Sequence, residues 1–239
     1  MKQQGILTII MTFIRLMPFM HTIYRYTGLL LASCVFFSTP VLASEITVQV
    51  LDNGNKPLRG IVVYLEATDG KYSADIPPRE VTVYQKDKKF TPYITVKSMY
   101  DVLVFENQDN LTHHIFTVLS KDISFRLKKN EVVRNKQILK EGKALMACNI
   151  HDWMAGYVFT VDTPYYGKTN DNGELRFALP DQKEFTIRIW HPQMAKKDSQ
   201  LTSTIVSKQQ NPVVFRLSEE MAEIPTQEND ELFEFLEDY

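Results

Sequence analysis

Beyond residue 44, apolar and polar residues alternate in short runs that are separated by turn residues. Residues 45–51 read EITVQVL and residues 60–66 read GIVVYLE, with a polar turn at 52–57 between them. A period of two residues predicts strands, and the turn predicts that these two strands form a hairpin. Further short strands are predicted at residues 81–84, 91–96, 102–105, 115–118, 132–138, 143–147, 156–161, 163–169, 174–178, 185–190 and 213–217. No segment has convincing helical periodicity, so the pattern indicates an all-β sandwich or barrel.

The first 43 residues differ from the rest of the chain. They contain no acidic residue, three basic residues and two apolar stretches, and they end in Val41, Leu42 and Ala43, which suit a signal-peptidase cleavage site. We therefore expect a signal peptide at residues 1–43, with Met17 or Met20 as alternative starts. The mature chain is expected in the periplasm, with no stable membrane span after the leader is removed.

Charge is unevenly distributed along the mature chain. Because the leader removes three basic residues and no acidic one, 24 basic and 29 acidic residues remain, and the net charge is −5. Residues 219–239 hold nine of the carboxylates and no Lys or Arg, which predicts an acidic, disordered tail. The remainder is mildly basic but has no dense basic stripe with interleaved aromatic residues, so no nucleic-acid partner is expected.

The number of cysteines limits the roles that a thiol can have in the mature chain. An alternative interpretation of the leader treats residues 31–34 (LASC) as a lipoprotein box, but the apolar run continues past Cys34 through Phe37. Cleavage after Ala43 removes Cys34 and leaves Cys148 as a single cysteine in the mature chain. A lone cysteine in an exported protein pairs with another chain, stays free, or binds a metal.

The residues around Cys148 favour metal binding. Cys148, His151 and Met154 lie three residues apart, immediately after a predicted strand. One thiolate, two imidazoles and a weak axial thioether form the ligand set of blue copper sites, and this set requires a second histidine from elsewhere. His113 suits that role, because it ends the polar loop 107–112 after another predicted strand. We therefore expect one type 1 copper ion bound by His113, Cys148, His151 and Met154.

These motifs carry a resemblance to a known family. The Cys-x2-His-x2-Met loop resembles the short ligand loop of amicyanin, a cupredoxin, and residues 107–113 resemble its first-histidine loop. Residues 107–154, together with the string VDTPY at 161–165, resemble cupredoxin-like methylamine utilization proteins. The resemblance implies His113, Cys148 and His151 as equatorial ligands, Met154 as the axial ligand, and His151 as the point of electron exit.

Each of these residues also has a simpler interpretation. Cys148 alone would be a buried core thiol, and Met154 alone would fill the core. Met146 competes with Met154 for the axial position, although Met146 lies within a predicted strand. Only one of the adjacent residues His113 and His114 can easily face the metal, and we favour His113. Asn107 is expected to brace the first-histidine loop, or otherwise to form a turn.

A second resemblance lies on both sides of the copper motifs. Asp52, Gly54, Pro57, Leu58 and Gly60 match the opening turn of carboxypeptidase regulatory-like (transthyretin-like) domains, and residues 169–175 (TNDNGEL) match a later motif of that family, with Leu175 in place of the usual Phe. The resemblance implies a cupredoxin Greek-key sandwich inserted in or packed on a smaller sandwich. The alternative is a single cupredoxin with extended ends.

This interpretation divides the chain into five parts. They are a signal peptide (1–43), the first part of the regulatory-like sandwich (44–78), a cupredoxin domain (79–162), the second part of the regulatory-like sandwich (163–218) and an acidic tail (219–239).

Electron transfer is the function that these residues predict best. Four protein ligands leave no open position for a substrate, which disfavours an oxidase or a hydrolase. The resemblance implies a redox protein partner, either an amine dehydrogenase or a cytochrome. Copper delivery is the alternative, although the mature chain lacks Met-rich or His-rich tracts. A structural module stabilised by metal is a further alternative.

Overall fold

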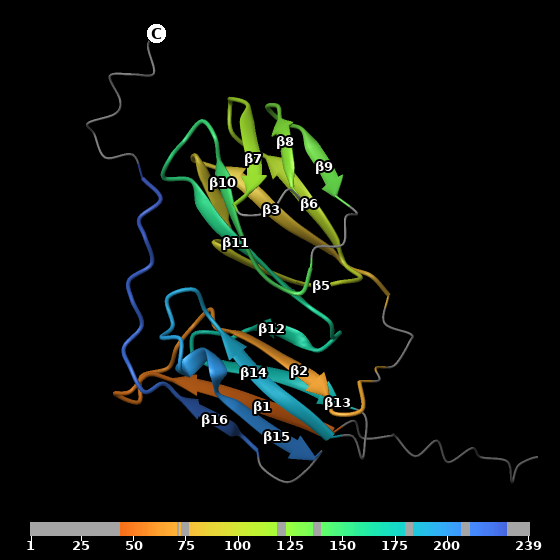
Figure 1. The fold of residues 1–239 in the computed structure, drawn as a ribbon, viewed down its shortest axis with the longest axis vertical. Coiled ribbons are helices and arrows are strands. Elements are labelled where there is room, and N and C mark those ends of the chain that lie inside the picture. The colour runs from red at the N-terminus through yellow and green to blue at the C-terminus, as the bar shows by residue number, and fades with distance from the viewer. Residues whose placement is uncertain are drawn as a thin grey trace, which may run out of the picture. The chain divides into compact units, whose positions relative to one another are not determined.

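The fold is described from a computed structural model, for residues 44–70, 72, 77–118, 123–135, 140–179, 184–206 and 211–228 (Figure 1). Within these residues the chain forms β-strands and one 3-10 turn, η1 (Asp198–Gln200), and it contains no helix long and apolar enough to cross a membrane. The all-β prediction is therefore confirmed. The expected signal peptide and lipoprotein box lie outside the described residues and stay predictions.

The middle of the chain forms two sheets, here called the central sandwich. One sheet has the order β5 (Ile94–Ser98), β11 (Ala155–Val161), β10 (Gly142–Cys148), β7 (His113–Thr117) and β8 (Ser124–Leu127). The other has the order β4 (Lys89–Thr91), β3 (Glu80–Lys86), β6 (Val102–Asn107) and β9 (Val132–Asn135). Their facing side chains form one apolar core that includes Phe105, Ile115 and Val158.

Segments from both sides of the central sandwich pair with each other in two further sheets, here called the flanking sandwich. One sheet has the order β13 (Glu174–Leu179), β1 (Ser44–Leu51) and β16 (Val213–Arg216). The other has the order β12 (Tyr166–Lys168), β2 (Val62–Ala67), β14 (Glu184–Trp190) and β15 (Thr202–Val206). One sandwich is thus inserted in the other, as the fold prediction stated. The boundaries of the predicted parts and the transthyretin-like resemblance stay predictions.

The predicted hairpin of residues 45–51 and 60–66 is wrong. β1 pairs with β13 and β16, whereas β2 pairs with β12 and β14. The turn between β1 and β2 instead carries the chain from one sheet to the other, and Val48 and Val50 of β1 pack in the same core as Val63 and Leu65 of β2. Periodicity identifies the buried face of each strand, but it does not identify the neighbour that supplies its hydrogen bonds.

The strand prediction also missed three short strands, β4, β8 and β15. β4 has three residues and lies at a sheet edge, while β8 has four residues of which only Leu127 is buried, so neither has a strong apolar signature. A cluster of apolar residues from both sandwiches joins β2 and β14 to β5 and β11; it includes Val62, Ile94 and Phe159.

Replacing Gly173 with Ala is expected to lower the free energy of unfolding. Gly173 ends the NDNG turn with φ +70°, and an added Cβ would lie 2.5 Å from the Val50 carbonyl oxygen. The strained φ and the displaced backbone together should cost about 2–4 kcal/mol in urea unfolding. The control is Gly70→Ala, where φ is +64° and no heavy atom lies within 4 Å of the added Cβ. Equal losses in the two variants would contradict this prediction.

His191 is expected to make folding pH-dependent. The residue is 4% exposed, its Nδ1 accepts the Gln193 N–H at 3.3 Å, and burial, together with the charge of Lys168, lowers its pKa to about 4. Between that value and about 6.5, the unfolded chain binds more protons than the folded one, so stability falls as the pH falls.

The pH effect is measurable by urea unfolding of the parent protein and His191→Gln at pH 7 and pH 4.5. The parent should lose about 2–3 kcal/mol more than the variant over this interval, because all other titrating groups are shared. Equal losses would show that His191 does not contribute.

Candidate metal centre

Strand pairing places the predicted ligands at one end of the central sandwich. β7 and β10 are antiparallel neighbours, with Cys148 opposite Ile115, so the beginning of β7 lies beside the end of β10. Side chains alternate between the faces of a strand. His113 therefore shares the face of Ile115 and Cys148, whereas His114 faces the opposite way, where its Nε2 lies 3.5 Å from Ser124 Oγ.

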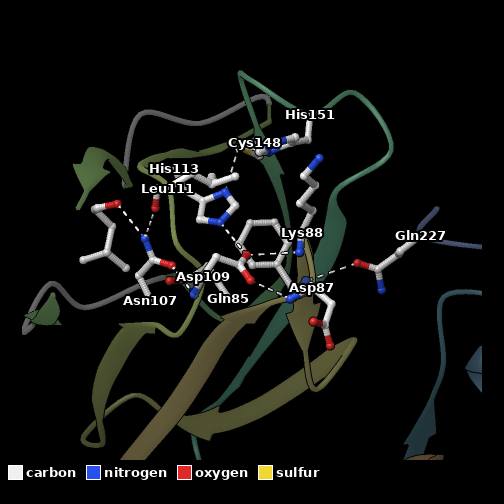
Figure 2. Close-up of polar contacts among 12 residues, drawn as sticks. Gln85, Asp87, Lys88, Asn107, Asp109, Leu111, His113, Cys148, His151 and Gln227 are labelled. Atoms are coloured by element: carbon white, nitrogen blue, oxygen red, sulfur yellow. Dashed lines mark hydrogen bonds and ion pairs between the residues drawn. The ribbon is translucent and has the colours of Figure 1, made fainter. Parts of the chain in front are cut away.

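The three candidate ligands Cys148, His113 and His151 meet in the interior (Figure 2). Cys148 Sγ lies 3.6 Å from His113 Nδ1 and 3.6 Å from His151 Nδ1. The three donor atoms lie within 4.8 Å of one another, and all three residues are buried. A first-row metal with bonds of about 2.3 Å to sulfur and about 2.0–2.1 Å to nitrogen separates the sulfur from each nitrogen by about 3.6–3.8 Å in tetrahedral or trigonal geometry. The donor set therefore fits a metal ion.

Backbone hydrogen bonds close the loop that carries these ligands. The Met154 N–H donates to the His151 carbonyl at 3.0 Å, and the Cys148 N–H donates to the Met154 carbonyl at 3.2 Å. The Asn149 N–H donates to the His114 carbonyl at 2.9 Å, which ties the loop to the start of β7. The loop geometry is thus fixed by the backbone.

Both candidate axial ligands, Met146 and Met154, are fully buried in the apolar cluster that contains Cys148. Met154 ends the ligand loop, and its carbonyl accepts the Cys148 amide, whereas Met146 lies within β10. The structure brings His113, Cys148 and His151 together. Met154 as the axial ligand stays a prediction.

The surroundings of the thiol and the imidazole favour the protonation states of an ion pair. Burial raises the pKa of Cys148, but hydrogen bonds from His113 and from backbone amides, including that of Ile150, outweigh burial and lower it. Burial lowers the pKa of His113, but its contacts with Cys148 and Asp109 outweigh burial and raise it. The site therefore stabilises a thiolate, which is the form of cysteine that binds metals.

Asp109 is a part of the site that the sequence analysis missed. Its Oδ2 lies 2.7 Å from His113 Nε2, on the opposite side of the ring from Cys148 (Figure 2). A carboxylate in this position fixes the tautomer of a ligating histidine and makes the ligand more basic. The sequence feature that could have identified Asp109 is its position four residues before His113 within a polar loop.

Asn107 braces the loop, as expected from the sequence. Its Nδ2 donates to the Leu111 and Leu127 carbonyls at 2.7 Å and 3.0 Å, and its Oδ1 accepts the Asp109 N–H at 2.9 Å. Asn107 is 1% exposed, so these bonds are formed away from solvent. They hold the loop that presents His113.

The second histidine, His151, is buried, but both polar and apolar residues next to it in the ligand loop are exposed. His151 is 2% exposed, and its ring centroid lies 5.1 Å from that of His113 and 5.3 Å from that of Trp153. Ile150 beside it is 55% exposed, and Asn149 and Asp152 are exposed as well. An exposed apolar side chain thus lies directly next to a candidate ligand.

The similar solved structures include cupredoxins. The copper-containing nitrite reductase of Thermus scotoductus shares 20% identity over 39% of this chain, with a TM-score of 0.32, and the match spans only 24% of that enzyme. Amicyanin from Paracoccus versutus shares 16% identity over 41% of this chain and 98% of its own (TM-score 0.31). A purple cupredoxin from Nitrosopumilus maritimus shares 14% identity over 35% of this chain and 99% of its own (TM-score 0.29).

No protein-family model matches this chain, and no curated protein matches it. The candidate site is defined by the positions of His113, Cys148 and His151 in this chain.

Replacing His113 should weaken metal binding far more than replacing its neighbour. His113→Ala removes one of the three converging donor atoms. Loss of a residue that only orients a ligand lowers metal affinity by roughly 10–100-fold. Loss of the ligand His113 itself should lower Cu(II) affinity by more than this. His114→Ala should change the Cu(II) affinity less than about threefold, because side chains alternate along β7 and His114 lies on the face opposite His113. Competition titration with a chelator measures both values. A larger loss in His114→Ala would reverse the assignment.

Proposed function

We propose that this protein is an exported blue copper protein that transfers single electrons through a centre made by His113, Cys148, His151 and Met154. The observation that carries the proposal is the pair of 3.6 Å distances from Cys148 Sγ to His113 Nδ1 and His151 Nδ1. Copper bound there supplies a centre that accepts and releases one electron, because thiolate and thioether favour Cu(I) and imidazole suits both oxidation states.

The protein's own contribution is a rigid, dry set of ligands. Cys148 is 3% exposed and His113 is fully buried, so solvent reorganisation around these ligands is small. Their backbone is held by β7, β10 and the closed ligand loop, and Asp109 orients the His113 ring. A fixed ligand geometry favours fast electron transfer, and a full ligand set leaves no place for a substrate. We therefore infer an electron carrier in preference to an enzyme.

The partner is proposed to be a redox protein, such as an amine dehydrogenase or a cytochrome, met in the periplasm. The signal-peptide-like leader and the resemblance to methylamine utilization proteins support this assignment. The exposed Ile150 next to His151 supports contact at this rim, because apolar side chains at a surface favour protein association. Electrons would then leave through the His151 imidazole.

Replacing Cys148 with Ser should abolish the spectrum of the copper protein. The purified mature parent protein is expected to develop an intense blue or green thiolate-to-copper band with one equivalent of Cu(II). Cys148→Ser removes the sulfur on which that band depends. Visible absorption and electron paramagnetic resonance of both proteins, loaded identically, measure the difference.

Two results would contradict the proposal. Colourless but tightly held copper in the parent protein would favour delivery or a structural role. An unchanged visible band in Cys148→Ser would place the copper elsewhere. A Cys148→Ser protein that unfolds in urea like the metal-free parent shows that loss of the band is not loss of the fold.

A further inference from the structure

The segment that follows β16 contacts both sandwiches. Residues 218–228, here called the linking segment, form no strand. The Ser218 N–H and Oγ donate to Asp198 Oδ1 at 3.0 Å and 2.6 Å, and the Ala222 N–H donates to the Gln193 carbonyl at 3.0 Å. These bonds fix the first half of the linking segment to the flanking sandwich.

The second half of the linking segment binds the central sandwich at β4. Gln227 Oε1 accepts the Phe90 N–H at 3.2 Å, and Glu228 pairs with Lys89 at 2.9 Å. β4 is an edge strand, and Phe90 is one position beyond the pair Lys86–Lys89 that closes the β3–β4 turn. In an antiparallel hairpin that position directs its N–H away from the partner strand. Gln227 therefore satisfies a backbone donor that β3 cannot reach.

The turn of the same hairpin holds Asp109. Asp87 and Lys88 form the two-residue connection, and both have positive φ, 55° and 56°, as the tight turns of β-hairpins require. The Asp87 N–H donates to Asp109 Oδ1 at 2.6 Å, and the Lys88 N–H donates to Oδ2 at 3.0 Å. The same Oδ2 lies 2.7 Å from His113 Nε2. In Figure 2, Asp87 and Lys88 lie between Asp109 and Gln227.

We propose that the linking segment secures the β3–β4 hairpin, and that the hairpin's turn amides position Asp109, which in turn holds the His113 ring for metal binding. Gln227 and Asp109 are thus positioning residues that act on a ligand without touching the metal. The inference rests on the proposed metal site, and it gives the flanking sandwich a role in supporting that site. Its basis is the Gln227–Phe90 hydrogen bond at one end of the hairpin and the hydrogen bonds from the turn amides through Asp109 to His113 at the other, joined by the backbone of residues 87–90.

The neutral Gln227 contact carries more of this coupling than the ion pair beside it. Glu228 is 71% exposed and Lys89 is 34% exposed, so water and salt weaken their attraction. Phe90, by contrast, is 1% exposed, and it packs in the core that contains Cys148 and Met154. Loss of the Gln227 acceptor would leave a nearly buried N–H without its partner, which favours opening of β4.

Amide hydrogen exchange in the metal-free protein tests this path without copper. Gln227→Ala should accelerate exchange at Phe90 by about 3- to 10-fold, the range expected from loss of one hydrogen bond. If the hairpin is coupled to Asp109, exchange at Asp87 and Lys88 should accelerate by at least about threefold as well. Gln227→Glu keeps an acceptor at the same chain length and should restore the parent rates. The control, Arg59→Ala, removes an exposed ion pair with Asp171 that does not involve the linking segment, and should change none of the three rates.

Copper release from the loaded protein provides the second measurement. Gln227→Ala should release copper about 2- to 10-fold faster and shift the visible band, and Gln227→Glu should reverse both changes. Acceleration confined to Phe90, with Asp87 and Lys88 unchanged, would overturn the coupling whatever metal the protein binds. A blue copper protein whose release rate and spectrum do not respond to Gln227→Ala would overturn the inference while leaving the proposed function intact. Loss of the blue band in the parent would instead refute the proposed function.

Discussion

The antiparallel pairing of β7 with β10 is the constraint on which the candidate metal centre depends. Because Cys148 lies opposite Ile115, the first residue of one strand and the last residue of the other lie at the same end of the sheet. The alternation of side chains then directs His113 and Cys148 to the inner face. A shift of one residue in this register would turn the Cys148 side chain outward and exchange the roles of His113 and His114.

The inner position of the ligands has an electrostatic cost that the surrounding groups offset. Burial opposes both the Cys148 thiolate and a protonated His113, yet the two groups stabilise each other. Asp109 contributes a further negative charge on the far side of the His113 ring, and its carboxylate is itself bonded to two backbone amides. Every polar group of this small network thus has a partner, which is the condition for a buried polar site.

The flanking sandwich is formed from segments that lie far apart along the chain. β1 precedes the central sandwich along the chain, and it pairs with β13 and β16, which follow the central sandwich. The chain therefore enters and leaves the central sandwich from strands that belong to the flanking sandwich. The linking segment adds a further connection, since it bonds to Gln193 and Asp198 at one end and to Phe90 and Lys89 at the other. The edge strand β4 is covered by side-chain contacts, without an additional strand, which limits unwanted pairing at this edge.

The sequence by itself determined the strand-rich fold and the candidate ligand loop. Period-two patterns identified most strands, because a strand with one buried face has apolar residues at alternate positions. The spacing Cys148, His151, Met154 identified the ligand loop, since nearby residues of one loop are held close by the chain itself. The choice of His113 over His114 agrees with the alternation of side chains along β7, in which His113 shares the face of Ile115.

Only the tertiary structure decided how distant segments meet. It separated β1 from β2 into different sheets, because hydrogen-bond partners are chosen by packing of whole sheets and leave no local pattern. It brought the Asp87–Lys88 turn to Asp109 and Gln227 to Phe90. These contacts join residues that are far apart in sequence, and their donors are backbone amides. Because nearly every residue has a backbone amide, the residue types in the sequence do not predict such contacts.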